Sequence, residues 1–205
     1  MARDIRLKFQ DDLDRQLVRR TKELAQLNLL VKSERQHYEQ DVINRLVIPH
    51  AYSHYEGFIK HASILFLKYI IGIYNPENVV PHNILALEIQ KHMETGKSKS
   101  IVEYINLINI IREKQTHISF KPESVINTHS NLKSDVLKEI MVICDLRYDA
   151  YWQGKSLFID NTLLRYRNQI SHGELISLDI KTVIDCLSSV IEIIRTYKQK
   201  LDDKI

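Results

Sequence analysis

The sequence predicts an all-α fold, and three features of composition and pattern support this prediction. Only five Gly and four Pro occur among 205 residues, too few for a sandwich or barrel built from many tight turns. Leu, Ile, Lys, Glu and Gln are abundant, as is typical of helices. Apolar residues also recur three, four or seven positions apart over most of the chain, which indicates helices with one buried face.

Two long amphipathic helices are expected first. The first is predicted from residue 5 to about 38, with a single apolar stripe formed by Ile5, Phe9, Leu13, Leu17, Leu24, Leu27 and Val31. A free coiled coil is the alternative, but the stripe is irregular and a second strong pattern follows at once. The second helix is predicted from about 41 to 74, with Pro49 kinking it or delaying its start. Joined tightly, the two helices form an antiparallel hairpin, the usual spine of a helical bundle.

The middle of the chain has weaker signals. Short helices are predicted at 81–93 and 101–112, separated by a break at 95–98. The triplet Gly96-Lys97-Ser98 within this break lacks the upstream glycine and the preceding strand of a phosphate-binding loop. Residues 115–130 are loop-like, and 118–120 have the composition of a short edge strand.

Three further helices are expected after this region. They are predicted at 132–146, at 156–170 after a turn around 149–154, and at 178–201. Gly173 stands where a glycine commonly ends a helix. No repeat or linker divides the chain. We therefore predict one helical domain over 1–205, with an irregular insertion at about 76–130.

Composition indicates a soluble protein and excludes several classes. The chain is 44% apolar and 27% charged with a net charge of only +3, so charge alone does not indicate a nucleic-acid partner. Cys144 and Cys186 lie in apolar helical patterns and are expected to be small buried hydrophobes in a reducing compartment. The N-terminus is charged, unlike a signal peptide. The longest apolar stretch, 64–73, is too short to span a bilayer. A cytoplasmic location is expected.

Metal chemistry has little support in the pattern. No Cys pair has zinc-like spacing and no His-Glu-x-x-His segment occurs. His50 and His54 are four residues apart on one predicted helix face, with Glu56 and His61 nearby. Such a pair can ligate a metal, but isolated pairs are more often packed or solvent-facing. No metal and no cofactor are therefore expected.

A polar motif ends the helix predicted at 156–170. Asn168 and His172 are four residues apart and share a helix face, and the long side chain of Arg167 reaches the same end. The helix dipole favours a positively charged imidazole at His172. An imidazolium beside a guanidinium suits an anionic substrate such as phosphate, and His transfers protons near neutral pH. The alternative is an ordinary helix end, with Arg167 paired to a neighbouring acid.

Three segments resemble one protein family. Residues 167–174 (RNQISHGE) resemble the signature of the HEPN superfamily, an Arg followed by four to six residues and a His, commonly with a polar residue directly after the Arg. Residues 51–60 (AYSHYEGFIK) resemble the aromatic-Glu-Gly-Phe-x-Lys segment of stand-alone prokaryotic HEPN-like nucleases. Residues 130–137 (SNLKSDVL) are similar to a stretch upstream of the motif in the same group. The resemblance covers residues 15 to 198, approximately.

This resemblance implies an endoribonuclease of the toxin or phage-defence kind. HEPN proteins are helical bundles that typically dimerise and bring two Arg/His motifs into one cleft, and active members cleave RNA without metal. The implied partners are RNA, a second copy of the chain and an antitoxin protein. His172 is then the acid or base at the 2′-hydroxyl or the leaving 5′-oxygen. Arg167 binds the scissile phosphate, and Asn168 orients His172 or the phosphate.

Supporting roles follow from the same resemblance. Glu56 is expected to hold Arg167 or Lys60 in place, with a buried acid paired to a structural base as the alternative. Arg165 and Lys60 are candidate RNA-binding residues. Arg165 also satisfies the loose spacing to His172, but Arg167 is preferred because Asn168 follows it directly.

One departure and two rival functions remain open. Some HEPN toxins carry a Tyr two residues after the His that a partner nucleotidyltransferase modifies, and Glu174 stands in that place here. The first rival is a catalytically inactive HEPN module that binds RNA, a nucleotide or a protein. The second is a helical scaffold that assembles through its long N-terminal hairpin.

Overall fold

The computed structural model describes residues 2–33, 36–74, 80–95, 105, 108–109, 118 and 120–205. Its described residues contain helices and no strand, which confirms the all-α prediction. The helices are α1 (Ala2–Lys32), α2 (His37–Ile73), α3 (His82–Thr95), α5 (Pro122–Val125), α6 (Ser134–Ile143), α7 (Ala150–Leu157), the π-helical η1 (Phe158–Leu164), α8 (Arg165–Ser171) and α9 (Ile180–Asp202).

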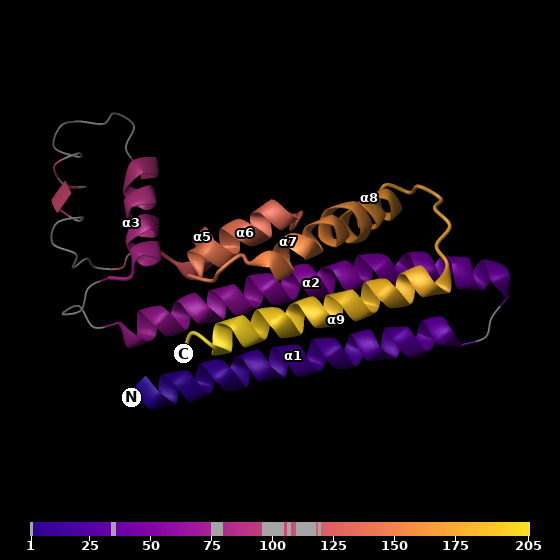
Figure 1. Cartoon of the computed structure of the whole chain (residues 1–205), viewed down its shortest axis with the longest axis horizontal. Coiled ribbons are helices and arrows are strands. Elements are labelled where there is room, and N and C mark those ends of the chain that lie inside the picture. The colour runs from indigo at the N-terminus through magenta and orange to yellow at the C-terminus, as the bar shows by residue number, and fades with distance from the viewer. Residues whose placement is uncertain are drawn as a thin grey trace.

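Three long helices form the base of the bundle. Figure 1 shows α1 antiparallel to α2, with α9 packed against both and parallel to α2. The predicted hairpin is therefore confirmed, although α1 ends at Lys32 rather than near Tyr38. The second helix runs from His37 through Pro49 without interruption, so the proline does not delay its start.

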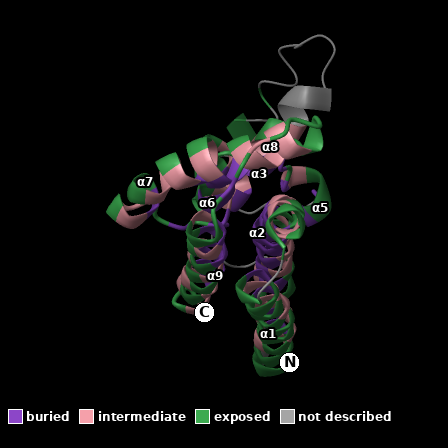
Figure 2. Cartoon of the chain, turned by 90° about the vertical axis from the view of Figure 1, so that its right-hand side faces the viewer, coloured by how far each residue is buried: buried purple, intermediate pink, exposed green. Residues whose placement is uncertain are grey.

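The apolar stripe predicted for the first helix faces the core. Phe9, Leu13, Leu24 and Val31 are buried, and Ile5, Leu17 and Leu27 pack against the core while partly exposed. Figure 2 shows the buried faces of these helices turned inward and the exposed faces outward. In contrast, Leu46 of α2 is apolar but 62% exposed.

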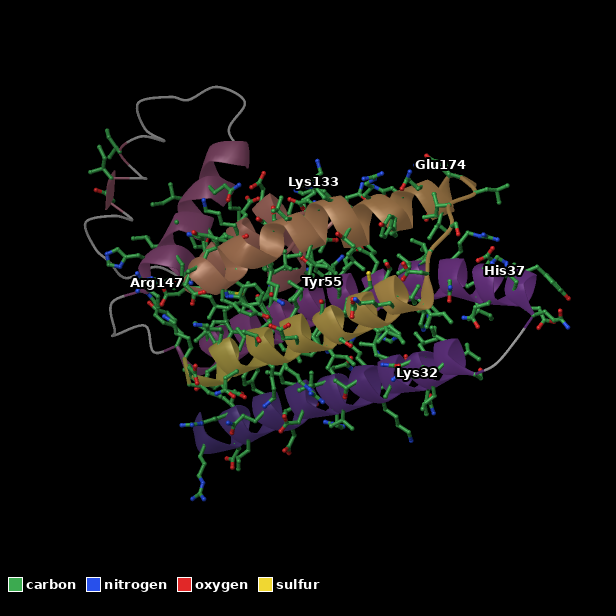
Figure 3. The ribbon with its side chains drawn as sticks, turned by 45° about the vertical axis from the view of Figure 1, so that its right-hand side comes forward. Lys32, His37, Tyr55, Lys133, Arg147 and Glu174 are labelled. Atoms are coloured by element: carbon green, nitrogen blue, oxygen red, sulfur yellow. The ribbon has the colours of Figure 1, made fainter. Side chains whose placement is uncertain are left out.

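A second layer lies over α2. The helices α7, η1 and α8 form one continuous helical run, and η1 and α8 contact α2. The turn predicted at 149–154 is wrong. Asp149 caps α7 by accepting the Tyr151 backbone N–H at 3.2 Å, and Gly154 lies within the helix. Figure 3 shows Tyr55 of α2, which is fully buried, in the core between the layers.

The middle region is only partly described. The helix predicted at 81–93 is confirmed by α3, and the loop-like stretch contains the short α5. Phe120 is not in a strand, and Ser119 lies outside the described residues. The triplet at 96–98 and most of 101–112 lie outside them too; residues 105, 108 and 109 are helical. No helix in the described part of the chain combines the length and apolar character of a membrane-spanning segment.

Candidate active site

The polar motif lies at the C-terminal end of α8. His172 is the last residue of the turn, with φ −90° and ψ 5°, and Gly173 follows with φ +81°. The Gly173 N–H donates to the Ile170 carbonyl at 3.0 Å and the Glu174 N–H to the Gln169 carbonyl at 2.9 Å. This pair of bonds is a Schellman cap, as Gly173 predicts. It leaves the exposed His172 side chain at the helix end.

Arg167 lies among neutral groups. Its guanidinium stacks over the Tyr52 ring, with Cζ 4.9 Å from the ring centroid. Nη1 donates to Oδ1 of Asn131 at 3.0 Å and to Oδ1 of Asn168 at 2.7 Å, and Nη2 to the Ser130 carbonyl at 3.5 Å. We call Arg167, Tyr52, Asn131 and Asn168 the Arg167 cluster.

The charge of Arg167 is not neutralised by a carboxylate. No acid within the described ranges forms an ion pair with it, so the pairing proposed for an ordinary helix end is absent there. Neutral oxygens fix the direction of the guanidinium while its positive charge remains. Such an arrangement suits an incoming phosphate, because an oriented and uncompensated Arg can bind it with two N–H groups.

Tyr52 joins the cluster to the loop before α6. Its hydroxyl accepts the Leu132 backbone N–H at 2.6 Å, and both residues are buried. Burial is the main cause that raises the pKa of Tyr52, and a hydrogen bond to Glu56 raises it further. Tyr52 therefore stays a neutral phenol. The three segments that resembled the family, around Tyr52, Asn131 and Arg167, meet at this one place.

The comparison with protein families agrees with this convergence. The family model described as RiboL-PSP-HEPN matches the chain over residues 15–203. The chain belongs to this HEPN family. No curated protein and no solved structure is significantly similar to it. Membership supports a nuclease or an RNA-binding module as the general class of this HEPN chain.

The other predicted site residues of the HEPN chain are placed differently. Glu56 is half-buried and interacts with the Tyr52 hydroxyl, and it forms no ion pair with Arg167 in the described part of the chain. Arg165 is exposed at the start of α8, outside the Arg167 cluster. Lys60 is exposed on α2, eight residues beyond Tyr52, or roughly 12 Å along the helix axis. The described contacts bring neither Arg165 nor Lys60 to Arg167.

Tyr52 and Asn131 were not among the predicted site residues. Both lie inside segments that resembled the family, and that was the available signal. Asn131 follows two residues in the left-handed region, His129 with φ 51° and Ser130 with φ 58°. This tight turn directs the Ser130 carbonyl and the Asn131 amide toward Arg167. It contains no glycine, so nothing in the sequence indicates its left-handed backbone.

Two anchors hold the surroundings of the site in place. Asp160 of η1 accepts the backbone N–H of Ser134 at 2.8 Å and its hydroxyl at 2.5 Å, which ties the first turn of α6 to the second layer. The loop after His172 is tied to α2, because the buried Asn44 donates to the Leu178 carbonyl at 2.7 Å. The HEPN motif therefore sits at a helix end that is fixed on both sides.

Proposed function

We propose that the chain is a metal-independent endoribonuclease in which Arg167, Asn168 and His172 carry the chemistry. The observation that supports this most is the Arg167 cluster, an oriented guanidinium with no carboxylate partner in the described part of the chain. It lies five residues before an exposed imidazole. Family membership supports the same class of function.

The residues have the following roles in this proposal. Arg167 binds the scissile phosphate and stabilises the charge that develops on it. The imidazole of His172 removes the proton of the 2′-hydroxyl, whose oxygen attacks phosphorus, or it protonates the departing 5′-oxygen. The new P–O2′ bond forms as the P–O5′ bond breaks, which gives a 2′,3′-cyclic phosphate and a 5′-hydroxyl. Because the nucleophile is the RNA's own 2′-oxygen, the step requires no metal-bound water. Asn168 holds Arg167 through its amide oxygen. In this proposal its N–H groups donate to the phosphate.

The acid and the base are supplied by two copies of the chain. One His172 cannot act on both sides of the same phosphorus in one step, and a homodimer that joins two helix ends in one cleft provides the second imidazole. We expect a dimer at micromolar concentration. A monomeric solution mass in an active preparation would argue against the composite site.

The activity is tested directly on RNA. Structured and unstructured RNA is incubated with the protein in excess chelator, with Arg167→Ala and His172→Ala as variants and Arg165→Ala to decide between the two candidate arginines. We expect a loss of about 100-fold or more for the first two variants and a clearly smaller loss for Arg165→Ala. Cleavage that persists in both site variants would overturn the assignment.

A silent binding module is the second candidate, since the chain's family membership fits it equally. If no form cleaves RNA but the wild type shifts RNA in a gel and Arg167→Ala does not, that function replaces the nuclease. The toxin or defence role has its own test. Expression of the wild type should arrest bacterial growth, and expression of His172→Ala should not.

A further inference from the structure

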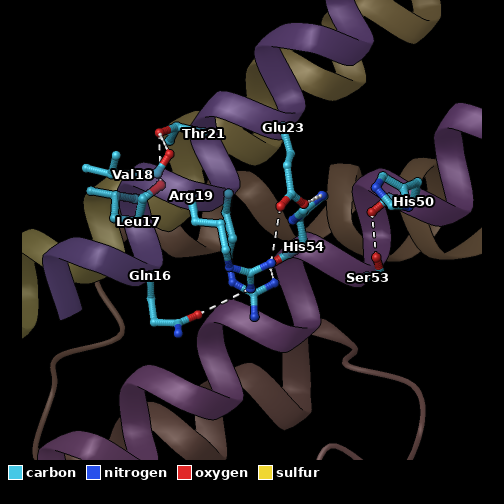
Figure 4. A network of polar contacts seen from close by, with 10 residues as sticks. Gln16, Leu17, Val18, Arg19, Thr21, Glu23, His50, Ser53 and His54 are labelled. Carbon is cyan, nitrogen blue, oxygen red and sulfur yellow. Dashed lines mark hydrogen bonds and ion pairs between the residues drawn. The ribbon is translucent and has the colours of Figure 1, made fainter. Parts of the chain in front are cut away.

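A second polar cluster lies between α1 and α2. Glu23 of α1 and His50 and His54 of α2 each offer a ligand atom, and these atoms lie within 4.8 Å of one another. Figure 4 shows Glu23 pointing from α1 toward His54, with His50 on the neighbouring turn of α2. The His54 backbone carbonyl accepts from Arg20 of α1 at 3.5 Å. Two helices far apart in sequence therefore contribute to one group.

The inner two residues already have the separation that a metal site requires. His54 Nε2 lies 3.2 Å from Oε2 of Glu23. Two ligands about 2.0–2.1 Å from a tetrahedral ion stand roughly 3.3 Å apart. The other carboxylate oxygen of Glu23 accepts from Arg19 Nη1 at 3.2 Å, which fixes the carboxylate and leaves Oε2 facing His54.

His54 supplies the observation that points to a ligand. Its side chain is only 4% exposed, and Nδ1 has no hydrogen-bond partner among the described residues. Nε2 has the 3.2 Å approach to Glu23, but that contact does not meet hydrogen-bond geometry. A buried polar atom without a partner is costly, so such atoms usually indicate a missing water or ion. Here Nε2, which makes no well-oriented hydrogen bond, faces a carboxylate and a second imidazole, and both of those side chains are open to solvent or partly so.

We propose that Glu23, His50 and His54 bind one divalent transition-metal cation, best matched by zinc, which ties α1 to α2. Two imidazoles and one carboxylate form a ligand set that zinc accepts, with a water completing four-coordination. His50 and Glu23 reach solvent and give the ion a path of entry.

The charges around the three ligands are mixed. Arg19 donates to Glu23 and Arg20 to the His54 backbone carbonyl, and both guanidinium groups repel a cation. The Glu23 carboxylate offsets part of this repulsion, so we expect moderate affinity.

The metal site stabilises the hairpin of α1 and α2 and takes no part in RNA cleavage. His54 and Tyr52 are two residues apart on α2, so they point to different sides of the helix. Tyr52 contacts Arg167, whereas His54 faces α1. Metal binding should therefore raise stability, while cleavage of RNA in chelator is unaffected. The two proposals fail independently.

Calorimetric titration with zinc chloride tests the site on the whole chain after treatment with chelator. His50→Ala and Glu23→Gln remove ligands from positions open to solvent, so folding should survive, and circular dichroism checks it. His37→Ala is the matched control, because His37 also faces an acid, Asp41, four residues away at 3.6 Å, but belongs to no three-ligand group among the described residues. We expect one zinc per chain in the wild type and control, and at least a ten-fold weaker affinity in both ligand variants.

Two further readouts support or overturn the proposal. Zinc at a hundred-fold excess over Kd should raise the Tm by roughly 5 to 10 °C in the wild type. Cobalt in place of zinc should give the visible absorption of a four-coordinate ion, lost in His50→Ala. The proposal is overturned if the wild type binds no zinc, if both ligand variants bind it unchanged, or if His37→Ala loses it equally.

Discussion

Replacing Tyr52 with Phe tests how the Arg167 cluster is held. The hydroxyl of Tyr52 accepts the Leu132 N–H at 2.6 Å, and the two residues are 2% and 0% exposed. Phe keeps the ring beneath Arg167 but leaves this buried N–H without its acceptor, which costs about 1 to 3 kcal/mol. For a urea m-value of about 2 kcal/mol per M, the unfolding midpoint should fall by roughly 0.5 to 1.5 M.

Urea unfolding followed by circular dichroism measures this change, with Tyr38→Phe as the control because Tyr38 is 68% exposed. A loss below about 0.5 kcal/mol, the usual range for surface changes, would refute the reasoning. Tyr52→Leu, which also removes the ring, should show a coupling energy with Arg167→Ala of about 0.5 to 1 kcal/mol in a double-mutant cycle. A coupling near zero would mean that the ring and the guanidinium do not interact.

Three more predictions concern the fold. Asp160→Ala should lower the free energy of unfolding by about 1 to 2 kcal/mol, because it removes the acceptor of both Ser134 donors, and Asp160→Asn should recover part of this. Gly173→Ala should lower the free energy of unfolding by about 1 kcal/mol. The cost comes from the φ of +81° alone, because no atom lies within 4 Å of an added Cβ. Gly173→Asn should cost less, and an Ala variant that melts at the wild-type temperature would contradict this. Burial raises the pKa of the Cys144 and Cys186 thiols to about 12, so the unfolded chain loses these protons first and stability should fall as pH rises from about 9 to 12. Ellman's reagent should leave both thiols unlabelled in the native protein at pH 8, and rapid labelling would contradict their burial.

The long helices could be predicted because each buries a continuous stripe over many turns. The apolar pattern of residues 5–31 and that of 178–201 both exceed the length at which helical periodicity is ambiguous. Their ends were harder to place. The first helix ends at Lys32, but no glycine or proline follows to mark that end. The polar residues up to His37 are equally compatible with a continuing helix. Gly154 suggested a turn, but an exposed glycine is tolerated inside a helix at a cost of about 1 kcal/mol.

The site was predictable in its local part only. The order of Arg167, Asn168 and His172 along one helix end follows from sequence spacing. The partners of Arg167 depend on tertiary structure, because Tyr52 comes from another layer and Asn131 from a left-handed turn. The π-helical stretch before α8 also changes which face of the following residues meets α2, so counting at 3.6 residues per turn does not separate Arg165 from Arg167.

The spread of the Arg167 cluster along the chain has a consequence during synthesis. The ribosome delivers Tyr52 first, Asn131 much later and Arg167 last, so a nascent chain that stops before Arg167 contains two of the partners and no guanidinium between them. The loop after His172 is anchored on α2 only when Leu178 has also emerged. A translation product interrupted before Arg167 therefore lacks the assembled cluster, and one interrupted before Leu178 lacks the anchor of the loop that follows it.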